Sequence, residues 1–384
     1  MTRQLLLPAS IALSIISTPA CQLQGGDAAD EPDEQARLEA LLFDAPVAFR
    51  PDASAARVAE TAEPTSQLAP RDVVGEWSFD DCNSADTHLR DVFGRATSFR
   101  SVGVRCSDGV IGSPGIAIAA PEDIAYLPDQ PFYTFEAGVT LSGWFKPAVI
   151  TGTRTLFRKR DKGTSSFALL LNAGKYELVI GFGPGRAISL TSPSRAKTGV
   201  FQHVAATYDG STARLYVDGA EVNHFDVPGT IPVGPGPLLM GNDGSERRFD
   251  GSIDNVVFAT HALTSAQIAQ LLCVTREPLL VVSPEVIPPT PVGTAVSLDV
   301  ALTNRSGAVC PALTFNLQVF ALSTGLQLDP ASASSEVASG ATGHFTVTAV
   351  PRQPGDTQFF LFASEPTGAF SFLRQLFFEA TEPE

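Results

Sequence analysis

The sequence has few basic residues for its length. Its 384 residues include 26 Lys and Arg against 41 Asp and Glu, which gives a formal net charge of −15. A protein that binds nucleic acid needs a dense patch of Lys and Arg to neutralise phosphates, and no such patch is visible in the sequence. The charge balance therefore argues against a nucleic-acid partner. It mainly promotes solubility and can favour divalent cations.

The chain also lacks the short motifs that mark common catalytic sites. Neither the HExxH zinc motif nor the GxSxG nucleophile motif occurs. The histidines are scattered without the spacing of metal ligands, at His88, His203, His224, His261 and His344. We therefore expect a protein that is not an enzyme.

Cysteine is scarce, and none of the five cysteines has the CxxC spacing of zinc or redox sites. Apart from Cys21, four remain, an even number that fits disulfides in an oxidising compartment. Of the three possible pairings we favour Cys82 with Cys106 and Cys273 with Cys310, because each pair then lies within one predicted domain or at its edge. The chain-entropy model predicts that each disulfide stabilises the fold by about 3 to 4 kcal/mol. Buried free thiols are the alternative.

The N-terminal apolar run, residues 5–16, is too short to span a bilayer comfortably. It follows a basic residue and precedes small residues, which predicts a signal peptide over residues 1–20. A cysteine directly after a small residue resembles the bacterial lipobox, in which the thiol is lipidated, although Thr18 stands where an aliphatic residue is usual. We predict lipidation at Cys21 and an extracytoplasmic location, as an outer-membrane or cell-surface lipoprotein. The membrane contact would then be the lipid anchor alone, and secretion after cleavage near Ala20 is the alternative.

Residues 21–70 are predicted to form a disordered acidic tether. Within residues 22–70, ten acidic residues stand against three basic ones. A segment of such low hydrophobicity cannot bury enough surface to offset the entropy of ordering it. Like charges also keep it extended.

The most informative stretch is VFQHVAATYDGSTARLYVDG, residues 200–219. Its apolar residues alternate with the period of a β-strand. Asp209-Gly210 and Asp218-Gly219 supply tight turns, because Asp tolerates and Gly readily adopts a left-handed backbone. The pattern predicts three antiparallel strands over residues 202–208, 213–217 and 221–225.

This stretch resembles the central signature of bacterial laminin G-like domains of the concanavalin A-like lectin/glucanase class. Further blocks match in the expected order, namely GEWSFDD, TLSGWFKP, TLFRKRD and LLMGNDGSERRFDGSIDNVVFATHALTSAQIAQL, at residues 75–81, 140–147, 155–161 and 238–271. The resemblance implies a laminin G-like jelly-roll domain over residues 71–273. Related β-glucanases hydrolyse glycosidic bonds with a Glu-x-Asp-x-Glu strand, which is absent here. His203 matches a family position, and we interpret it as a packing or hydrogen-bonding residue.

The predicted fold class is all-β, a concanavalin A-like jelly-roll sandwich plus a smaller immunoglobulin-like β-sandwich. A dozen or so short strands in the first domain can bury their apolar faces only by stacking two sheets. Residues 86–115 are predicted to be loops, and only residues 264–272 read as a helix, with Thr264 or Ser265 as the N-cap.

After Cys273 the strand pattern restarts, and residues 274–384 hold about seven strands, the size of an immunoglobulin-like sandwich. The segments CVTREPLLVVSP, LTNRSGAVCPALTFNL and ATGHFTVTAVP resemble NEW3-type Ig-like modules of secreted bacterial hydrolases. That resemblance also suggests the pairing of Cys273 with Cys310.

The first domain suggests one metal site, for calcium. Calcium needs six to eight oxygen ligands, and proteins of this fold often hold one at an edge of the sandwich. Asp81 and Asp254 match family positions for it, and strands near the two ends of the domain should be adjacent. Asp91 is a poorer match to the family pattern. The alternative is that Asp254 binds loop backbone instead.

The leading functional prediction is a surface-anchored, non-catalytic binding or adhesion protein that recognises a glycan or a surface protein through the laminin G-like domain. Alternatives are a structural envelope protein and an accessory module of a secreted hydrolase. Aromatic rings near a guanidinium group would suit a glycan, and five residues of these types are Tyr126, Tyr133, Tyr176, Arg158 and Arg247. Each tyrosine is more consistent with packing than with a site.

Overall fold

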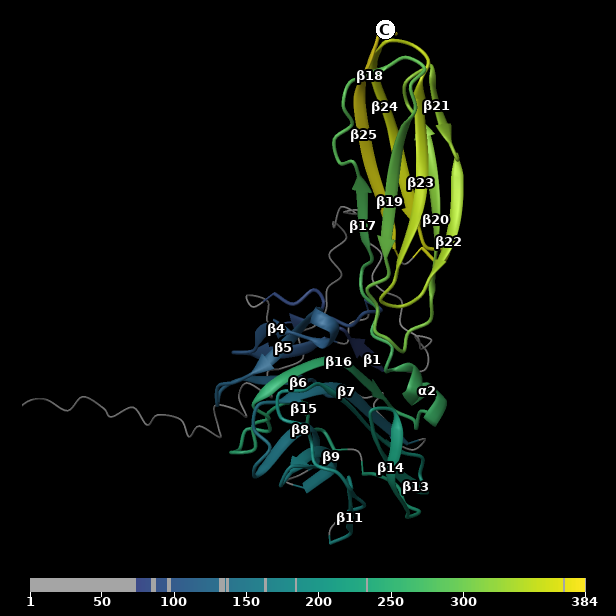
Figure 1. Ribbon diagram of the computed structural model, residues 1–384. Helices are drawn as coiled ribbons and strands as arrows, with labels where there is room; N and C mark the ends of the chain where they lie inside the picture. Colours follow the sequence, from purple (N-terminus) through teal and green to yellow (C-terminus); the bar gives the residue numbers. More distant parts are fainter. Residues whose placement is uncertain are drawn as a thin grey trace, which may run out of the picture. The chain divides into compact units, whose positions relative to one another are not determined.

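The computed structural model describes residues 74–383, with short gaps at 84–87, 95–97, 131–134, 136–137, 162–163, 184, 233 and 369. The predicted signal peptide, the lipidated Cys21 and the acidic tether lie outside these residues. In the part described, almost all regular structure is β-strand, as predicted, and four sheets form two sandwiches (Figure 1). No helix there is long and apolar enough to cross a membrane.

The first sandwich consists of two eight-stranded sheets. One has the strand order β14-β13-β12-β7-β16-β5-β4, with β1 paired to β16, and the other has the order β11-β10-β9-β8-β15-β6-β3-β2. The strands are β1 Gly75–Trp77, β2 His88–Leu89, β3 Phe99–Val102, β4 Arg105–Asp108, β5 Pro114–Ile118, β6 Ile124–Leu127, β7 Val139–Pro147, β8 Thr153–Asp161, β9 Thr164–Asn172, β10 Lys175–Gly181, β11 Ala187–Thr191, β12 Gln202–Tyr208, β13 Thr212–Val217, β14 Ala220–Asp226, β15 Leu238–Met240 and β16 Gly251–Ala259.

The signature stretch forms three strands, as predicted. β12 pairs with β7 on one side and with β13 on the other, and every residue of β12 is buried. Val204, Ala206 and Tyr208 face the main core between the sheets, while Ala205 belongs to a smaller cluster on the opposite face. The sheet is therefore covered on both faces at β12, which explains why this strand is apolar along its length.

The smaller cluster lies under the single α-helix described, α2 (Ser265–Gln270). Thr264 is its N-cap, since its side chain accepts a hydrogen bond from Gln267 N and the Gln267 side chain accepts one from Thr264 N, the reciprocal pattern of a capping box. Ile268 is the buried residue of this helix. The prediction of a helix with Thr264 as a possible N-cap is confirmed.

The prediction of loops over residues 86–115 is wrong. This segment contains β2, β3, β4 and the start of β5, all short strands that pair at the margins of the two sheets. Their own alternation is weak because they have two to five residues each. Their pairing with neighbouring strands supplies the hydrogen bonds that propensity alone does not predict. Cys106 of β4 forms the predicted disulfide with Cys82.

The second sandwich packs a four-stranded sheet, β17-β19-β23-β21, on a five-stranded sheet, β18-β25-β24-β20-β22. Leu298 and Val300 of the first sheet share one core with Phe315 and Phe359 of the second. The strands are β17 Leu279–Ser283, β18 Thr290–Pro291, β19 Val296–Thr303, β20 Leu313–Ala321, β21 Leu326–Asp329, β22 Ser332–Val337, β23 Thr342–Pro351, β24 Gly355–Ser364 and β25 Ser371–Thr381.

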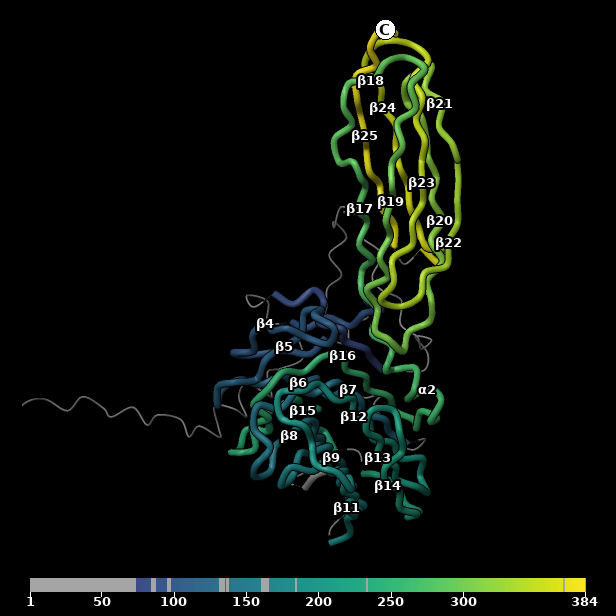
Figure 2. The backbone as a smooth tube through the Cα atoms, viewed as in Figure 1, coloured from purple at the N-terminus to yellow at the C-terminus, as the bar shows by residue number. Residues whose placement is uncertain are grey.

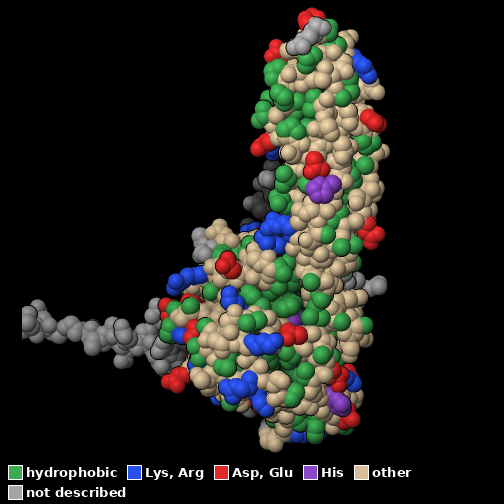
Figure 3. All heavy atoms as spheres, in the orientation of Figure 1, with side chains coloured by type: hydrophobic (Ala, Val, Ile, Leu, Met, Phe, Trp, Pro, Cys, Tyr) green, Lys and Arg blue, Asp and Glu red, His purple; other side chains and the backbone are tan. Residues whose placement is uncertain are grey.

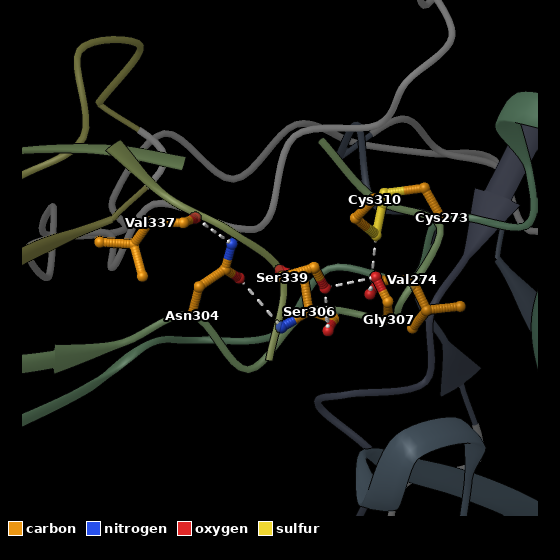
Figure 4. Close-up of a disulfide and its surroundings, with 8 residues drawn as sticks. All are labelled: Cys273, Val274, Asn304, Ser306, Gly307, Cys310, Val337 and Ser339. Carbon is orange, nitrogen blue, oxygen red and sulfur yellow. Dashed lines mark hydrogen bonds between the residues drawn. A yellow bond between two sulfur atoms is a disulfide. The ribbon is translucent and has the colours of Figure 1, made fainter. Parts of the chain in front are cut away.

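The turn after β19 is held by a buried asparagine and by the second predicted disulfide (Figure 4). Asn304 is fully buried, and it donates from Nδ2 to Val337 O at 3.0 Å and accepts from Ser306 N at 3.1 Å. Cys310 is bonded to Cys273, which follows α2. The disulfide and these hydrogen bonds fix the segment that begins the second sandwich.

The turn at Asp218-Gly219 carries the strictest backbone requirement in the signature stretch. Gly219 has φ +79° and an added Cβ would lie 2.3 Å from Leu272 Cδ1, whereas Gly210 has φ +89° with nothing within 4 Å. A left-handed backbone costs a residue with a Cβ about 1 to 2 kcal/mol.

We predict that Gly219→Ala lowers the free energy of unfolding by about 1 kcal/mol more than the matched control Gly210→Ala, because only the former also overpacks a neighbour. Chemical denaturation measures both. Adding Leu272→Ala to each variant should narrow the difference, and equal losses in the two single variants would contradict the contact.

Candidate functional site

The two described tyrosines considered for a glycan site are buried. Tyr126 is 6% exposed and Tyr176 is 1% exposed, while Tyr133 lies outside the described residues. Burial of both rings matches the packing interpretation. The described tyrosines therefore provide no exposed stacking surface on the first sandwich.

A cross-strand row places Tyr126 in the same line as Arg158. Tyr126 of β6 pairs with Leu239 of β15, which pairs with Arg158 of β8. The Arg158 guanidinium forms an ion pair with the buried Asp243, in the loop between β15 and β16. The arginine therefore anchors this loop to the sheet.

The loop between β15 and β16 is rigidly held by further hydrogen bonds. It is closed at its base by Phe249 N donating to Gly241 O at 2.7 Å. Asn242 donates from Nδ2 to the carbonyl oxygens of Pro121 and Asp123, at 2.8 and 2.9 Å. Thr155 N donates to Arg247 O at 2.6 Å, which ties the tip of the loop to β8. These contacts pre-organise the loop before any ligand arrives.

An open groove of about 450 Å³ lies between this loop and the start of β8, lined by Gly152, Thr153, Arg154, Ser245, Glu246 and Arg247. Arg154 is oriented by donating from Nε to Thr151 O at 3.0 Å and from Nη1 to Arg248 O at 3.3 Å. Arg247 is exposed, and its guanidinium has no partner within the part of the chain described. The groove therefore presents two guanidinium groups beside hydroxyl groups and one carboxylate. Figure 3 shows Lys and Arg side chains gathered on the visible face of this sandwich.

A second, smaller hollow of about 230 Å³ lies beside Tyr176, Gln202 and Asp218. Its polar groups bond mainly to one another, since Gln202 Oε1 accepts from Lys197 N at 2.8 Å and Gln202 Nε2 donates to Asp218 Oδ2 at 3.3 Å. Burial, assisted by the Asp218 charge, raises the pKa of Tyr176. Fewer groups are left for a ligand here than in the groove.

His203 is a structural residue, as predicted. It is fully buried on β12, with Nε2 2.8 Å from Ser142 Oγ and its ring packed edge-on against Trp144. Burial lowers the pKa of His203 to about 4, so the ring is neutral at physiological pH. A neutral, enclosed imidazole at this position holds β12 against β7.

The three carboxylates considered for calcium do not converge. Asp81 is exposed, and Asp91 is buried with Oδ1 accepting from Glu76 N at 2.9 Å. Asp254 is fully buried on β16. Across the described ranges, no three His, Cys, Asp or Glu side chains gather in a way that could hold a metal ion. Calcium binding therefore stays a prediction.

Asp254 instead holds the turn between β4 and β5. Its Oδ2 accepts from Val110 N at 2.7 Å and from Ser113 Oγ at 3.1 Å, and its Oδ1 accepts from Asn255 N at 2.8 Å. This matches the alternative interpretation of Asp254 as a residue that binds loop backbone. The β1 and β16 strands pair side by side, as expected for the two ends of the domain.

Burial raises the pKa of Asp254 to about 7, reinforced by the Asp80 charge and opposed by the three donors. Asp80, rather than the predicted Asp81, is the neighbouring acid that affects Asp254. Both residues follow the end of β1 at Trp77, where strand alternation no longer decides which side chain faces Asp254.

The comparison with known families agrees with this geometry. Residues 121–269 match the Laminin_G_3 model, described as the concanavalin A-like lectin/glucanases superfamily. These residues form a laminin G-type domain. The groove residues and Asp254 all lie within the matched range of that domain. A search of curated proteins finds no match to the chain.

Solved structures similar to the chain include three kinds of protein. Domain 4 of the extracellular arabinanase AbnA of Geobacillus stearothermophilus, in complex with arabinotriose, is 22% identical with a TM-score of 0.44, over 52% of this chain and 98% of that one. The binding domain of Paraclostridial Mosquitocidal Protein 1 is 11% identical with a TM-score of 0.46, over 80% and 89%. Trypanosoma rangeli sialidase is 16% identical with a TM-score of 0.42, over 55% and 36%. Likenesses at this level carry no functional argument.

The sequence signal for the groove is partial. Arg247 stands in the NDGSERRF run of the laminin G-type domain and is among the arginines named from sequence, whereas Arg154 and Glu246 are not. Their approach depends on how the turn before β8 meets a loop about ninety residues later in the chain. A local sequence pattern cannot predict a contact between residues so far apart in the chain.

The pKa of Asp254 makes stability depend on pH. Because the folded pKa of about 7 lies above the ordinary value of 3.8, the native state keeps a proton that the unfolded chain has lost between these pH values. The free energy of unfolding therefore falls as pH rises from about 4 to 7. Above about pH 7, the contribution of Asp254 to this free energy no longer changes with pH.

We predict that Asp254→Asn, which cannot ionise, gains stability relative to the wild type between pH 5 and pH 8. Urea denaturation at pH 5, 6.5 and 8 measures the difference, with the exposed Glu122→Gln as the control. A flat difference for Asp254→Asn as well would show that the folded pKa is not raised.

Proposed function

We propose that the laminin G-type domain binds an acidic glycan in the groove between the turn before β8 and the loop between β15 and β16. The observation that supports this is the pair of guanidinium groups of Arg154 and Arg247 in a pre-organised groove. Guanidinium groups match carboxylates geometrically and form charge-assisted hydrogen bonds with them. The side chains of Thr153, Ser245 and Glu246 supply partners for sugar hydroxyls.

The size of the groove suits a short segment of a sugar chain. Small-molecule sites usually have volumes of about 300 to 1,000 Å³, and this groove has about 450 Å³. It is open rather than enclosed, so a long glycan can pass through it. A binding role without catalysis is part of the proposal, because Glu246 is the one carboxylate among the described residues that line the groove, and glycoside hydrolysis uses a pair.

The same proposal places the domain at the cell surface. The two disulfides indicate an extracytoplasmic protein. Lipidation at Cys21, followed by the acidic tether, would hold the laminin G-type domain away from the membrane. This order of segments supports a surface-anchored adhesion protein.

We predict that Arg247→Ala weakens binding of the full chain to uronic-acid polysaccharides by about tenfold or more, since a hydrogen bond to a charged group contributes roughly 1.5 to 3 kcal/mol. Affinity electrophoresis in gels that contain alginate or pectate measures this. Arg105→Ala, which removes an exposed arginine of β4, is the matched control and should bind like the wild type.

Two further measurements, the salt dependence of binding and the release of reducing ends from the polysaccharide, complete the affinity electrophoresis. Binding in the groove should weaken as NaCl rises from 0.05 to 0.5 M, because salt screens the attraction between charges that are exposed to solvent. Equal binding by Arg247→Ala and wild type would contradict the site. Release of reducing ends from the polysaccharide would contradict the non-catalytic role.

Calcium is a separate part of the proposal. The predicted ligands Asp81, Asp91 and Asp254 do not meet in the described structure, so binding would require the turn at Asp254 to rearrange. Calorimetric titration with calcium and thermal unfolding at millimolar calcium test it, with Asp254→Asn as the control. Heat of binding and thermal stabilisation in the wild type but not in Asp254→Asn would support a site at Asp254. The absence of both in the wild type would rule the site out.

A further inference from the structure

The second sandwich has an exposed apolar face that its own core does not use. On the five-stranded sheet, the middle outward positions of the three neighbouring strands β20, β24 and β25 carry eight residues, flanked on the same face by Asn316, Ser364 and Ser371 at one end and by Asp356 and Glu379 at the other. The eight are the exposed Phe320, Phe377, Leu373, Gln318, Gln358 and Gln375 and the half-buried Phe360 and Phe362. We call these eight residues the Phe/Gln platform. Phe377 is 72% exposed, Leu373 is 65% exposed and Phe320 is 51% exposed.

The platform is regular because its strands pair without interruption. β24 pairs with β20 over six residues and with β25 over ten, and neither register shifts. Phe360 lies between Phe320 and Gln375 in one cross-strand row, and Phe362 lies between Gln318 and Leu373 in the next. Phenyl rings and amides thus lie next to one another on a continuous surface. Figure 2 shows β24 and β25 running side by side in the second sandwich.

The size of the platform argues against a protein partner bound there alone. Three strands about 4.8 Å apart, each with up to three outward residues about 6.8 Å apart, cover roughly 300 Å². A stable protein interface needs about 800 Å² from each partner. The largest exposed apolar patch of a monomeric protein is often functional, and a surface of this size suits a ligand of narrow cross-section.

The charge of the platform argues for an uncharged ligand. None of its eight side chains is ionisable. In the next cross-strand row on the same face, Asp356 of β24 lies opposite Glu379 of β25. This acidic margin repels anionic glycans and anionic lipid headgroups alike. The chemistry is therefore the opposite of that in the groove of the laminin G-type domain.

Phenyl rings beside amides match the two surfaces of a neutral sugar. The apolar C–H face of a pyranose packs on an aromatic ring, and its hydroxyls bond to amide groups at the edge of the ring. The side-chain amide of Gln318 has no hydrogen-bond partner within the described residues, and Gln375 Nε2 lies 3.5 Å from Gln358 Oε1. The amides are thus accessible to ligand hydroxyls.

We infer that the Phe/Gln platform binds an extended, uncharged polysaccharide. It is a second glycan site, on a different sandwich from the groove and with the opposite charge preference. The inference does not depend on the proposed function of the laminin G-type domain, and each can fail without the other.

The test is a pull-down of the full chain with insoluble cellulose, chitin and β-1,3-glucan. The double variant Phe360→Gln/Phe377→Gln should bind at least tenfold less tightly than the wild type to whichever polysaccharide the wild type binds. Leu279→Gln/Val286→Gln changes two exposed apolar residues of the same sandwich and should bind like the wild type. Binding should persist in 1 M NaCl, because no ion pair is involved, and Arg247→Ala should leave it unchanged.

Other occupants give different results. Circular dichroism and thermal unfolding establish that the double variant is folded, which the exposure of Phe377 favours. The inference would be overturned if the wild type bound none of the three polysaccharides. It would also be overturned if the double variant bound as tightly as the wild type. If polysaccharide binding is absent, two further tests identify the occupant. A wild-type dimer in sedimentation equilibrium that the double variant does not form would assign the face to a second copy of the chain. Binding to phosphatidylcholine vesicles that the double variant loses would assign it to a lipid surface.

Discussion

The first sandwich depends on the antiparallel pairing of β16 with strands that come from far earlier in the chain. β16 lies between β7 and β5, and it also pairs with β1. These contacts bring together the two ends of the domain, and Figure 1 shows β16 between its neighbours at the centre of the sheet. Ile253, Val256 and Phe258 of the same strand fill the core. Without this pairing neither the closed core nor the loop before β16 would exist.

Asp254 shows how a buried carboxyl group can serve architecture. It stands where the β16–β7 register shifts, and its carboxylate collects donors from the β4–β5 turn. A carboxylate that lies in the core needs such partners, because an unsatisfied buried charge is very costly. The residue thus links the position of β16 to the shape of the turn, and the raised pKa is a consequence of that burial.

The two sandwiches expose different chemistry. The groove of the laminin G-type domain presents one guanidinium group from the start of β8 and one from a loop held by Asn242 and Arg158. The Phe/Gln platform presents rings and amides on strands. Loops can bring charged side chains from distant positions into one place, while a sheet face repeats every second residue of neighbouring strands. An adhesion protein with both would recognise acidic and neutral glycans by separate surfaces. Figure 3 shows apolar side chains reaching the surface of the second sandwich among few charged ones.

The sequence by itself determined the all-β class, the three signature strands, the capped helix at Ser265–Gln270 and both disulfide pairings, because each depends on local periodicity, turn chemistry or a small number of cysteine combinations. Tertiary structure alone decided the rest. The strands between residues 86 and 115 form because neighbouring strands supply their hydrogen bonds. Asp80 rather than Asp81 affects Asp254, at a point beyond the end of β1 where no strand period applies. The groove requires Arg154 and Arg247 to meet, and the platform requires the registers of β20, β24 and β25. Contacts between residues distant in the chain leave no period or spacing by which a single sequence could reveal them.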